Sequence, residues 1–264
     1  MFEFRSLVSV SLLGLCLSGS ALAMEVNVDS NNNSAWKLDQ DFLERQVAQS
    51  MSPGRSVRTL IGHYPESIRS IVSVALDTYP DKYKEIIHSA ISAQPFSAED
   101  VVTIAVEKGI TECELIVETA IKAEPSYVSF VTRAATNASP KDFEDILRVA
   151  VVTEPESADK IIQIVAKSYP ERIADILSST LQYVPYVGEY VVDALLAVFP
   201  DKAEEVVEVS VREVRAETAQ VEKVISAALN AGVDAEVVSQ SAIKGGATTD
   251  EVMAAITKQS SNKF

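Results

Sequence analysis

Apolar residues recur along most of this chain with a spacing that is typical of amphipathic α-helices. Between residues 65 and 214 the pattern repeats every 15 residues, and a proline begins every repeat except the one at Ile110. Counting from that proline as position 0, positions +3, +6, +7, +10 and +11 are mostly apolar. Spacings of three and four residues place these positions on one side of an α-helix. The sequence therefore predicts ten similar helices, one in each repeat.

The prolines predict where each helix begins and ends. Nine of the ten prolines follow this spacing, at positions 65, 80, 95, 125, 140, 155, 170, 185 and 200. Proline suits the first position of a helix, because its missing N–H group would have no partner there. It also disfavours the helical conformation in the residue before it. We expect each repeat to be a helix of about 11–12 residues that begins at the proline, followed by a three-residue turn.

Alternate repeats differ in composition. Position +9 is apolar in the repeats that begin at 65, 95, 125, 155 and 185, whereas three of the others carry Ser89, Thr119 and Ser179 there. This alternation predicts a 30-residue unit, an αα-hairpin whose first helix is more deeply buried than its second. Hairpins of this kind stack into an α-solenoid, in which each unit is covered by its neighbours. The predicted fold is all-α, with five stacked hairpins over 65–214.

Residues 1–23 have the pattern of a secretory signal peptide. The apolar run Leu7–Leu17 is followed by small residues, and it is too short to span a bilayer. A lipoprotein signal that uses Cys16 is the alternative, but Leu15 stands where such signals need a small residue. No other stretch is apolar for 18 residues, so we expect no transmembrane segment. The predicted location is periplasmic or extracellular.

Four further segments flank or cap the repeats. Residues 24–38, which include Trp36, are expected to form a flexible lead, and 39–64 a cap helix with a degenerate repeat. Residues 215–259 are predicted to form a C-terminal cap with helices near 217–230, 235–244 and 250–258. Asp234 and Thr249 are placed to cap the last two of these helices. Residues 260–264 are expected to be a polar tail.

Charge narrows the range of partners. The chain has 38 acidic and 23 basic side chains, which give a formal net charge of −15. Binding to a nucleic-acid backbone needs clustered Lys and Arg, so no nucleic-acid partner is expected. Hydrophobic residues make up 47% of the chain, which is enough for a folded core and too much for a disordered acidic tail.

Few residues are suited to catalysis. The two histidines, His63 and His88, are far apart in the repeat pattern and are expected on the surface. Cys113 occupies the core-facing position +3, and without Cys16 no zinc site of the usual kind can be assembled. We expect no enzymatic activity, no cofactor and no metal site. Three tyrosines precede prolines, where packing between turns is favoured over an exposed aromatic row: Tyr64, Tyr79 and Tyr169.

Acidic residues recur at positions +4 and +5 of the second helix of each hairpin. We call this set the acidic ridge: Glu85, Glu114, Glu144, Asp145, Asp175, Glu204 and Glu205. Stacking is expected to bring these residues to one side of the solenoid. The ridge is either a solvated face that keeps the protein soluble or a surface that attracts a basic partner or divalent cations.

The sequence predicts a non-enzymatic scaffold or adaptor that binds proteins or extended polymers outside the cytoplasm. Its layout resembles that of HEAT-like, armadillo-like and tetratricopeptide solenoids, although the signature residues of those repeats are absent. The alternative is a lipid- or surface-coating protein, because short helices punctuated by proline resemble those of exchangeable apolipoproteins. The acidic polar faces disfavour this alternative, since helices at a membrane interface usually carry Lys and Arg.

Overall fold

The structure, a computed structural model, describes residues 40–50 and 52–261, and all the regular elements in these ranges are helices. The predicted signal peptide and lead lie outside the described residues, as do residues 262–264 of the predicted tail. The α-helices in the described ranges are α1 (Gln40–Ser50), α2 (Pro53–His63), α3 (Ile68–Thr78), α4 (Tyr83–Ala93), α5 (Ala98–Lys108), α6 (Cys113–Ala123), α7 (Val128–Ala138), α8 (Phe143–Thr153), α9 (Ala158–Ser168), α10 (Ile173–Leu181), α11 (Gly188–Val198), α12 (Ala203–Val214), α13 (Thr218–Asn230), α14 (Ala235–Lys244) and α15 (Thr249–Ser261).

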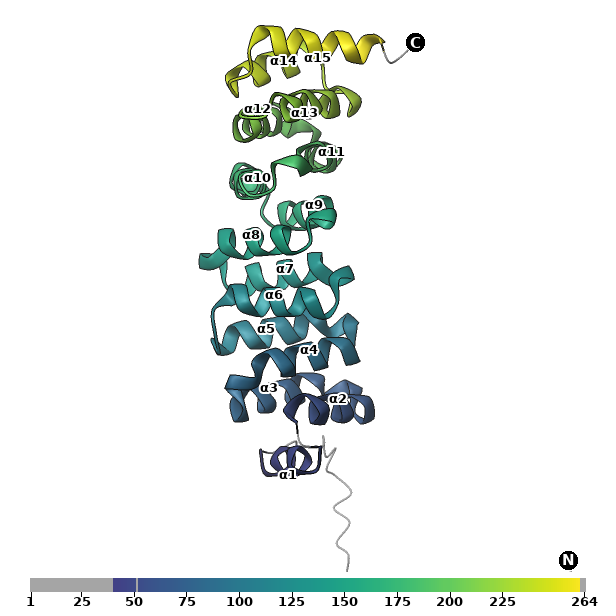
Figure 1. Cartoon of the computed structure of the whole chain (residues 1–264), viewed down its shortest axis with the longest axis vertical. Coiled ribbons are helices and arrows are strands. Elements are labelled where there is room, and N and C mark those ends of the chain that lie inside the picture. Colours follow the sequence, from purple (N-terminus) through teal and green to yellow (C-terminus); the bar gives the residue numbers. More distant parts are fainter. Residues whose placement is uncertain (1–39, 51, 262–264) are drawn as a thin grey trace, which may run out of the picture. The chain divides into compact units, whose positions relative to one another are not determined.

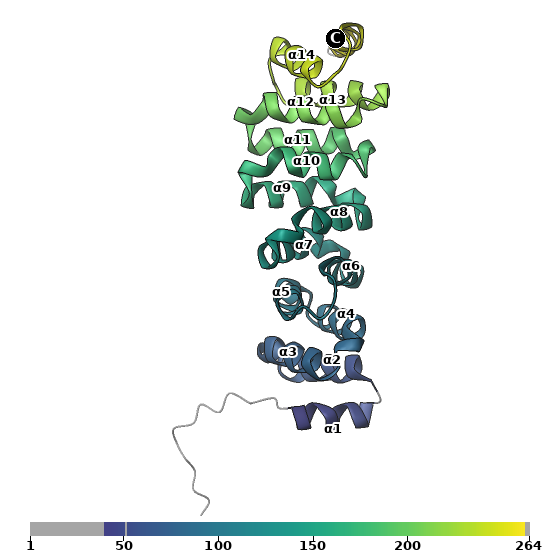
Figure 2. The ribbon, with the colours of Figure 1, turned by 90° about the vertical axis from the view of Figure 1, so that its left-hand side faces the viewer.

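The helices stack in chain order (Figure 1). Each helix packs against the helix two places further along the chain, from the pair α1 and α3 to the pair α13 and α15. The stack therefore has two columns, which Figure 2 shows from the side. We call α3, α5, α7, α9, α11, α13 and α15 the odd column. We call α2, α4, α6, α8, α10, α12 and α14 the even column. This arrangement confirms the predicted α-solenoid.

The core follows the predicted register. Position +6 is completely buried in all ten repeats, at Ile71, Ile86, Val101, Ile116, Val131, Ile146, Ile161, Ile176, Val191 and Val206. Positions +7 and +10 are completely buried as well, including the polar side chains of Thr132, Thr180 and Ser210. The helix spacing read from the sequence therefore identifies the packed face correctly.

The predicted difference in burial between the first and second helices of a hairpin is wrong. Positions +6 and +10 are equally buried in both columns, and at position +14 Gln94, Val184 and Val214 of the even column are more buried than Tyr79 or Tyr169. The physical reason is the two-column stack. Each repeat helix has neighbours in its own column and in the other column, so both columns are covered alike.

The turn lies at the start of each repeat, where the sequence predicted the start of an α-helix. A three-residue 3₁₀ turn begins at each of the nine spaced prolines, from η1 (Pro65–Ser67) through η2 (Pro80–Lys82), η3 (Pro95–Ser97), η4 (Pro125–Tyr127), η5 (Pro140–Asp142), η6 (Pro155–Ser157), η7 (Pro170–Arg172) and η8 (Pro185–Val187) to η9 (Pro200–Lys202). The α-helix then begins at position +3. The residue that precedes the proline links one helix to the next turn, as Tyr79 illustrates. Its backbone N–H donates to Ala75 O (2.9 Å), and its carbonyl oxygen accepts from Lys82 N (3.0 Å).

The repeat that lacks a proline has a different connection. Helix α5 ends at Lys108, and the capping residue Gly109 has a φ of 59°, which is left-handed and suits glycine. No 3₁₀ turn follows, and α6 begins at Cys113.

Near the C-terminus, Asp234 caps α14 as predicted by accepting from the backbone N–H of Glu236 (2.8 Å). Before α15, Thr248 makes the capping interactions expected of Thr249, and this helix extends to Ser261.

Candidate functional site

A groove of about 450 Å³ lies between the starts of α9 and α11, two neighbouring helices of the odd column. Tyr186 and Tyr190 line one side and are 54% and 62% exposed. Glu156 and Asp159 line the other side. We call this site the tyrosine groove. Its walls combine two aromatic rings with two carboxylates, a composition suited to a cationic ligand with an apolar stem.

The repeat register explains why these side chains face outward. Tyr186 and Tyr190 occupy positions +1 and +5, while positions +3, +6, +7 and +10 of the same repeat face the core. Asp159 occupies position +4 of the preceding odd-column repeat. Neither Glu156 nor Asp159 has an ion-pair partner among the described residues. The nearest base along the chain, Lys160, does not line the groove.

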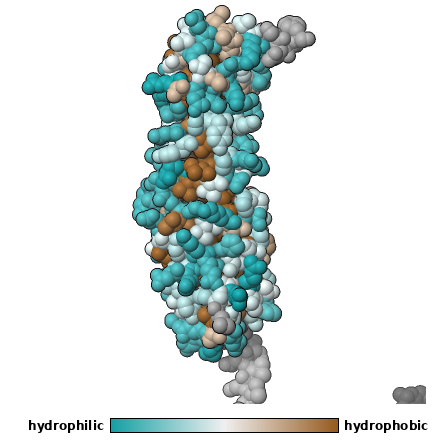
Figure 3. All heavy atoms as spheres, in the orientation of Figure 1, coloured by the Kyte–Doolittle hydropathy of each residue, from teal (hydrophilic) through white to brown (hydrophobic). Residues whose placement is uncertain are grey.

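Other exposed aromatic residues occupy the same positions of the odd column. Phe96 at +1 is 73% exposed, and Phe130 at +5 is 40% exposed and lies 5.8 Å from the ring of Tyr127. The sequence analysis did not single out these residues or the tyrosine groove. In an alignment of the five odd-column repeats, aromatic residues occur at +1 in two repeats and at +5 in two repeats. On the face shown in Figure 3, hydrophobic residues gather around the middle of the stack.

The residues of the acidic ridge lie on the even column, but most of them are bound within the chain. Glu85 accepts hydrogen bonds from the hydroxyl of Ser52 and from Gly54 N (3.2 Å), so it holds the start of α2. Glu205 lies 3.4 Å from Lys202 Nζ. Glu204 is exposed and has no ion-pair partner among the described residues.

Two arginines bind the other four acids of the ridge. The guanidinium group of Arg148 bonds Glu114 and Asp145, and Arg172 lies 2.9 Å from Asp175 and 3.6 Å from Glu144. Two of these pairs connect successive layers: Arg148 with Glu114 joins α8 to α6, and Arg172 with Glu144 joins η7 to α8, whereas the pairs with Asp145 and Asp175 are local. Three basic side chains, Arg148, Arg172 and Lys202, are paired with five of the seven ridge carboxylates, so the ridge keeps a net negative charge.

A second groove, of about 680 Å³, lies where the proline is missing. Gly109, Glu112 and Cys113 line one wall, and Lys141 and Asp142 line the other. Cys113 is half-buried, and burial together with the charges of Asp142 and Glu114 raises the pKa of its thiol to about 11. The thiol is therefore protonated at neutral pH and is a poor nucleophile.

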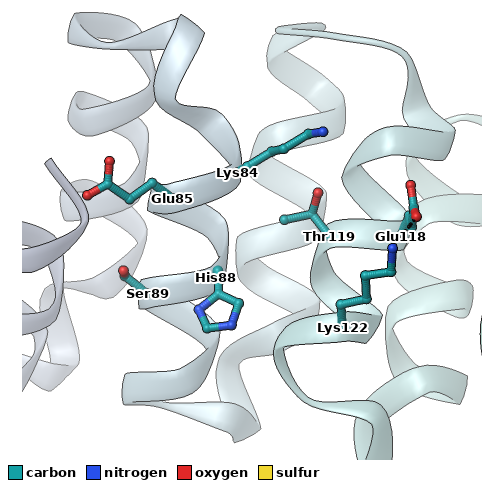
Figure 4. Close-up of a pocket in the computed structure, with 7 residues that line it drawn as sticks. All are labelled: Lys84, Glu85, His88, Ser89, Glu118, Thr119 and Lys122. Carbon is teal, nitrogen blue, oxygen red and sulfur yellow. Dashed lines mark hydrogen bonds and ion pairs between the residues drawn. The ribbon is translucent and has the colours of Figure 1, made fainter.

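A third groove, of about 410 Å³, lies between α4 and α6 and contains His88 (Figure 4). The side chain of His88 is exposed, and its Nδ1 lies 3.5 Å from the hydroxyl of Ser92. Lys122 and Glu118 form an ion pair on the opposite wall. Glu85 lines the groove on the α4 side, and its carboxylate points away from α6 in Figure 4 and accepts from Gly54 N of α2. The groove has no aligned nucleophile and base among the residues that line it.

The tyrosines that precede prolines are half-buried between layers. The ring of Tyr169 packs edge-on against Phe143 with 5.2 Å between centroids, and its hydroxyl donates to Asn137 Oδ1 (2.8 Å). Tyr64 and Tyr79 have the same intermediate exposure. These three residues therefore do not form an exposed aromatic row.

No group of three or more His, Cys, Asp or Glu side chains in residues 40–50 and 52–261 is placed to hold a metal ion. Within the same residues, no helix is both long enough and apolar enough to cross a bilayer.

Comparison of the chain with protein-family models, with curated proteins and with solved structures finds no match.

Proposed function

We propose that this protein is a non-enzymatic, exported scaffold that binds segments of partner proteins or extended polymers between the layers of its solenoid. The tyrosine groove is the observation that carries this proposal. Tyr186 and Tyr190 are more than half exposed and line a hollow between two layers. Tyrosine is enriched in the centres of protein interfaces, where its ring buries a large area and its hydroxyl can still find a partner.

The solenoid supports the same proposal. Stacked repeats present a continuous surface, on which an extended ligand can contact several layers. Phe96 and Phe130 provide further exposed rings on the same column. The proposal that the protein is exported rests only on the signal-peptide pattern of residues 1–23.

We assign partner binding to the tyrosine groove in preference to the acidic ridge. The ridge acids Glu114, Asp145 and Asp175 are engaged with arginines of this chain, so a basic partner or a divalent cation would have to compete with them. Glu156 and Asp159 of the groove have no ion-pair partner among the described residues, so a bound cation would not have to displace one.

Selection of displayed random peptides on the purified full chain tests the proposal. We expect enriched peptides whose binding is lost in the double variant Tyr186→Ala/Tyr190→Ala. Met253→Ala is the matched control, because Met253 is 57% exposed on α15 and is remote from the groove in the sequence. Failure to enrich any peptide, or equal binding by the double variant, would contradict the proposal.

Vesicle flotation separates the proposal from the lipid-coating alternative. The apolar faces of the helices are packed against one another, so coating a lipid surface would require the stack to open. We expect the protein to stay with the lipid-free fraction and its helicity to stay constant when vesicles are added. Flotation with a change in helicity would favour the alternative.

A further inference from the structure

Arginine side chains lie against aromatic rings at four places among the described residues: Arg45 is 5.9 Å from the ring centroid of Phe42 within α1, and the other three places lie in the repeats. Arg133 is 5.5 Å from the ring centroid of Phe130, Arg148 is 5.5 Å from Tyr183, and Arg172 is 3.8 Å from Phe143. Arg133 on α7 pairs with Glu99 on α5, Arg148 on α8 pairs with Glu114 on α6, and Arg172 in η7 lies 3.6 Å from Glu144 on α8. A ring, a carboxylate and a guanidinium group thus recur as a unit between layers.

The tyrosine groove has the same unit without the cation. In the layer of α5 and α7, the carboxylate of Glu99 at +4, the ring of Phe130 at +5 and Arg133 at +8 make one such unit. Four repeats further along the chain, the equivalent positions are Asp159, Tyr190 and Asp193. The acid and the ring are retained, but the residue that would supply the guanidinium group is an aspartate.

Three more acidic residues lie on the elements that form the groove, and one of them, Glu156, lines it. Glu156 lines the groove beside Asp159, and Asp193 and Glu189 lie on α11 with Tyr190. The positive ends of the dipoles of α9 and α11 amount to about half a charge each, so they do not outweigh these carboxylates. The groove is thus complementary to a positive charge that can lie flat on a tyrosine ring.

We infer that the tyrosine groove binds the guanidinium side chain of an arginine in an extended basic segment of a partner protein. The bound guanidinium group would bond Asp159 and lie over Tyr190, as Arg133 bonds Glu99 and lies over Phe130. Arginine fits better than lysine, because its planar group bonds a carboxylate and stacks on a ring at the same time. This inference rests on the proposed function and specifies the partner's chemistry.

Titration of the full chain with a blocked peptide of glycine and serine around two arginines tests the inference. The matched control peptide replaces both arginines by citrulline, which keeps the planar shape and removes the charge. In two-dimensional amide NMR we expect the arginine peptide to shift signals of 156–159 and 186–190. The citrulline peptide should bind at least about tenfold more weakly, given the usual strength of cation–π and charge-assisted contacts.

Three variants sharpen the test. Asp159→Asn should weaken binding of the arginine peptide about tenfold, and Asp193→Arg should abolish it by placing the chain's own guanidinium group in the groove. Asp193→Gln removes the same carboxylate without adding a cation, and it should keep most of the binding. Circular dichroism of each variant checks that the helices remain.

Four outcomes would overturn the inference. They are no binding of the arginine peptide, equal binding of the citrulline peptide, full binding by Asp193→Arg, and a response of the groove only to a neutral glucose oligomer. The proposed scaffold function is judged separately by the displayed random peptides. Enrichment of neutral or acidic peptides that need Tyr186 and Tyr190 would preserve that function while this inference fails.

Discussion

The guanidinium group of Arg148 on α8 bonds the carboxylate of Glu114 on α6, which lies 34 residues earlier in the chain. The two helices are neighbours in the even column, so this ion pair joins one layer of the solenoid to the next. Other side-chain contacts have similar separations, such as Lys108 with Asp77 at 31 residues and Tyr169 with Asn137 at 32. Polar contacts outside the core thus repeat with the period of the hairpin.

A double-mutant cycle measures the pair of Arg148 and Glu114. Both side chains are about 30% exposed, so we expect a coupling free energy of about 0.5–1 kcal/mol between Arg148→Met and Glu114→Gln. Denaturant unfolding of the two single variants and the double variant gives this value. The cycle of Arg148→Met with Glu171→Gln is the control and should be additive, because Glu171 is exposed and does not contact Arg148. Equal coupling in both cycles would show that the ion pair does not join the layers.

Truncation at position +6 should be costly in any repeat. Ile116 and Ile146 are completely buried, so Ile116→Ala or Ile146→Ala should lower the free energy of unfolding by about 2–5 kcal/mol. Denaturant titration of the full chain measures the loss. Glu171→Ala at an exposed position should change the same quantity by less than about 0.5 kcal/mol. A loss as small as this at Ile116 would contradict the packing register.

Gly109 and Gly62 should respond oppositely to the same substitution. Gly109 has a φ of 59°, so Gly109→Ala should destabilise the protein by about 1 kcal/mol through backbone strain. Gly62 lies within α2, and a Cβ there would meet no atom within 4 Å, so Gly62→Ala should stabilise it by about 0.5–1 kcal/mol. Thermal unfolding of both variants compares these effects directly. Gly109→Asn should cost less than Gly109→Ala, because asparagine tolerates the left-handed region better.

Cys113 should react slowly with thiol reagents while the chain is folded. Its pKa is raised to about 11 from the ordinary value near 9, so little thiolate is present at pH 8. Alkylation at pH 8, followed by mass spectrometry, should be much slower in buffer than in denaturant. Because the unfolded thiol ionises first as the pH rises from about 9 to 11, the stability of the fold should decrease across this window. Equal reaction rates in the two solutions would contradict the raised pKa.

The periodicity of the sequence predicted the helices closely because it reports a local property. Spacings of three and four residues around Ile116 or Ile146 define a buried face whichever helix covers it. The same logic located the C-terminal helices α13 and α14 to within one residue at either end, although no proline marks them. The start of each helix in the proline-led repeats was misplaced by three residues, because proline is compatible with the start of a 3₁₀ turn as well as with that of an α-helix.

The sequence by itself determined the helix-forming segments, the buried face of each repeat and the stacking of those faces into a solenoid. Tertiary structure decided which surface charges are neutralised. Glu114 and Asp159 both occupy position +4 of their repeats, yet Glu114 meets Arg148 and Asp159 meets no base among the described residues. The physical reason is that a charge is paired by the residue opposite it in the next layer. The offset between stacked helices decides which residue that is. The spacing of residues along a single helix gives no information about this offset.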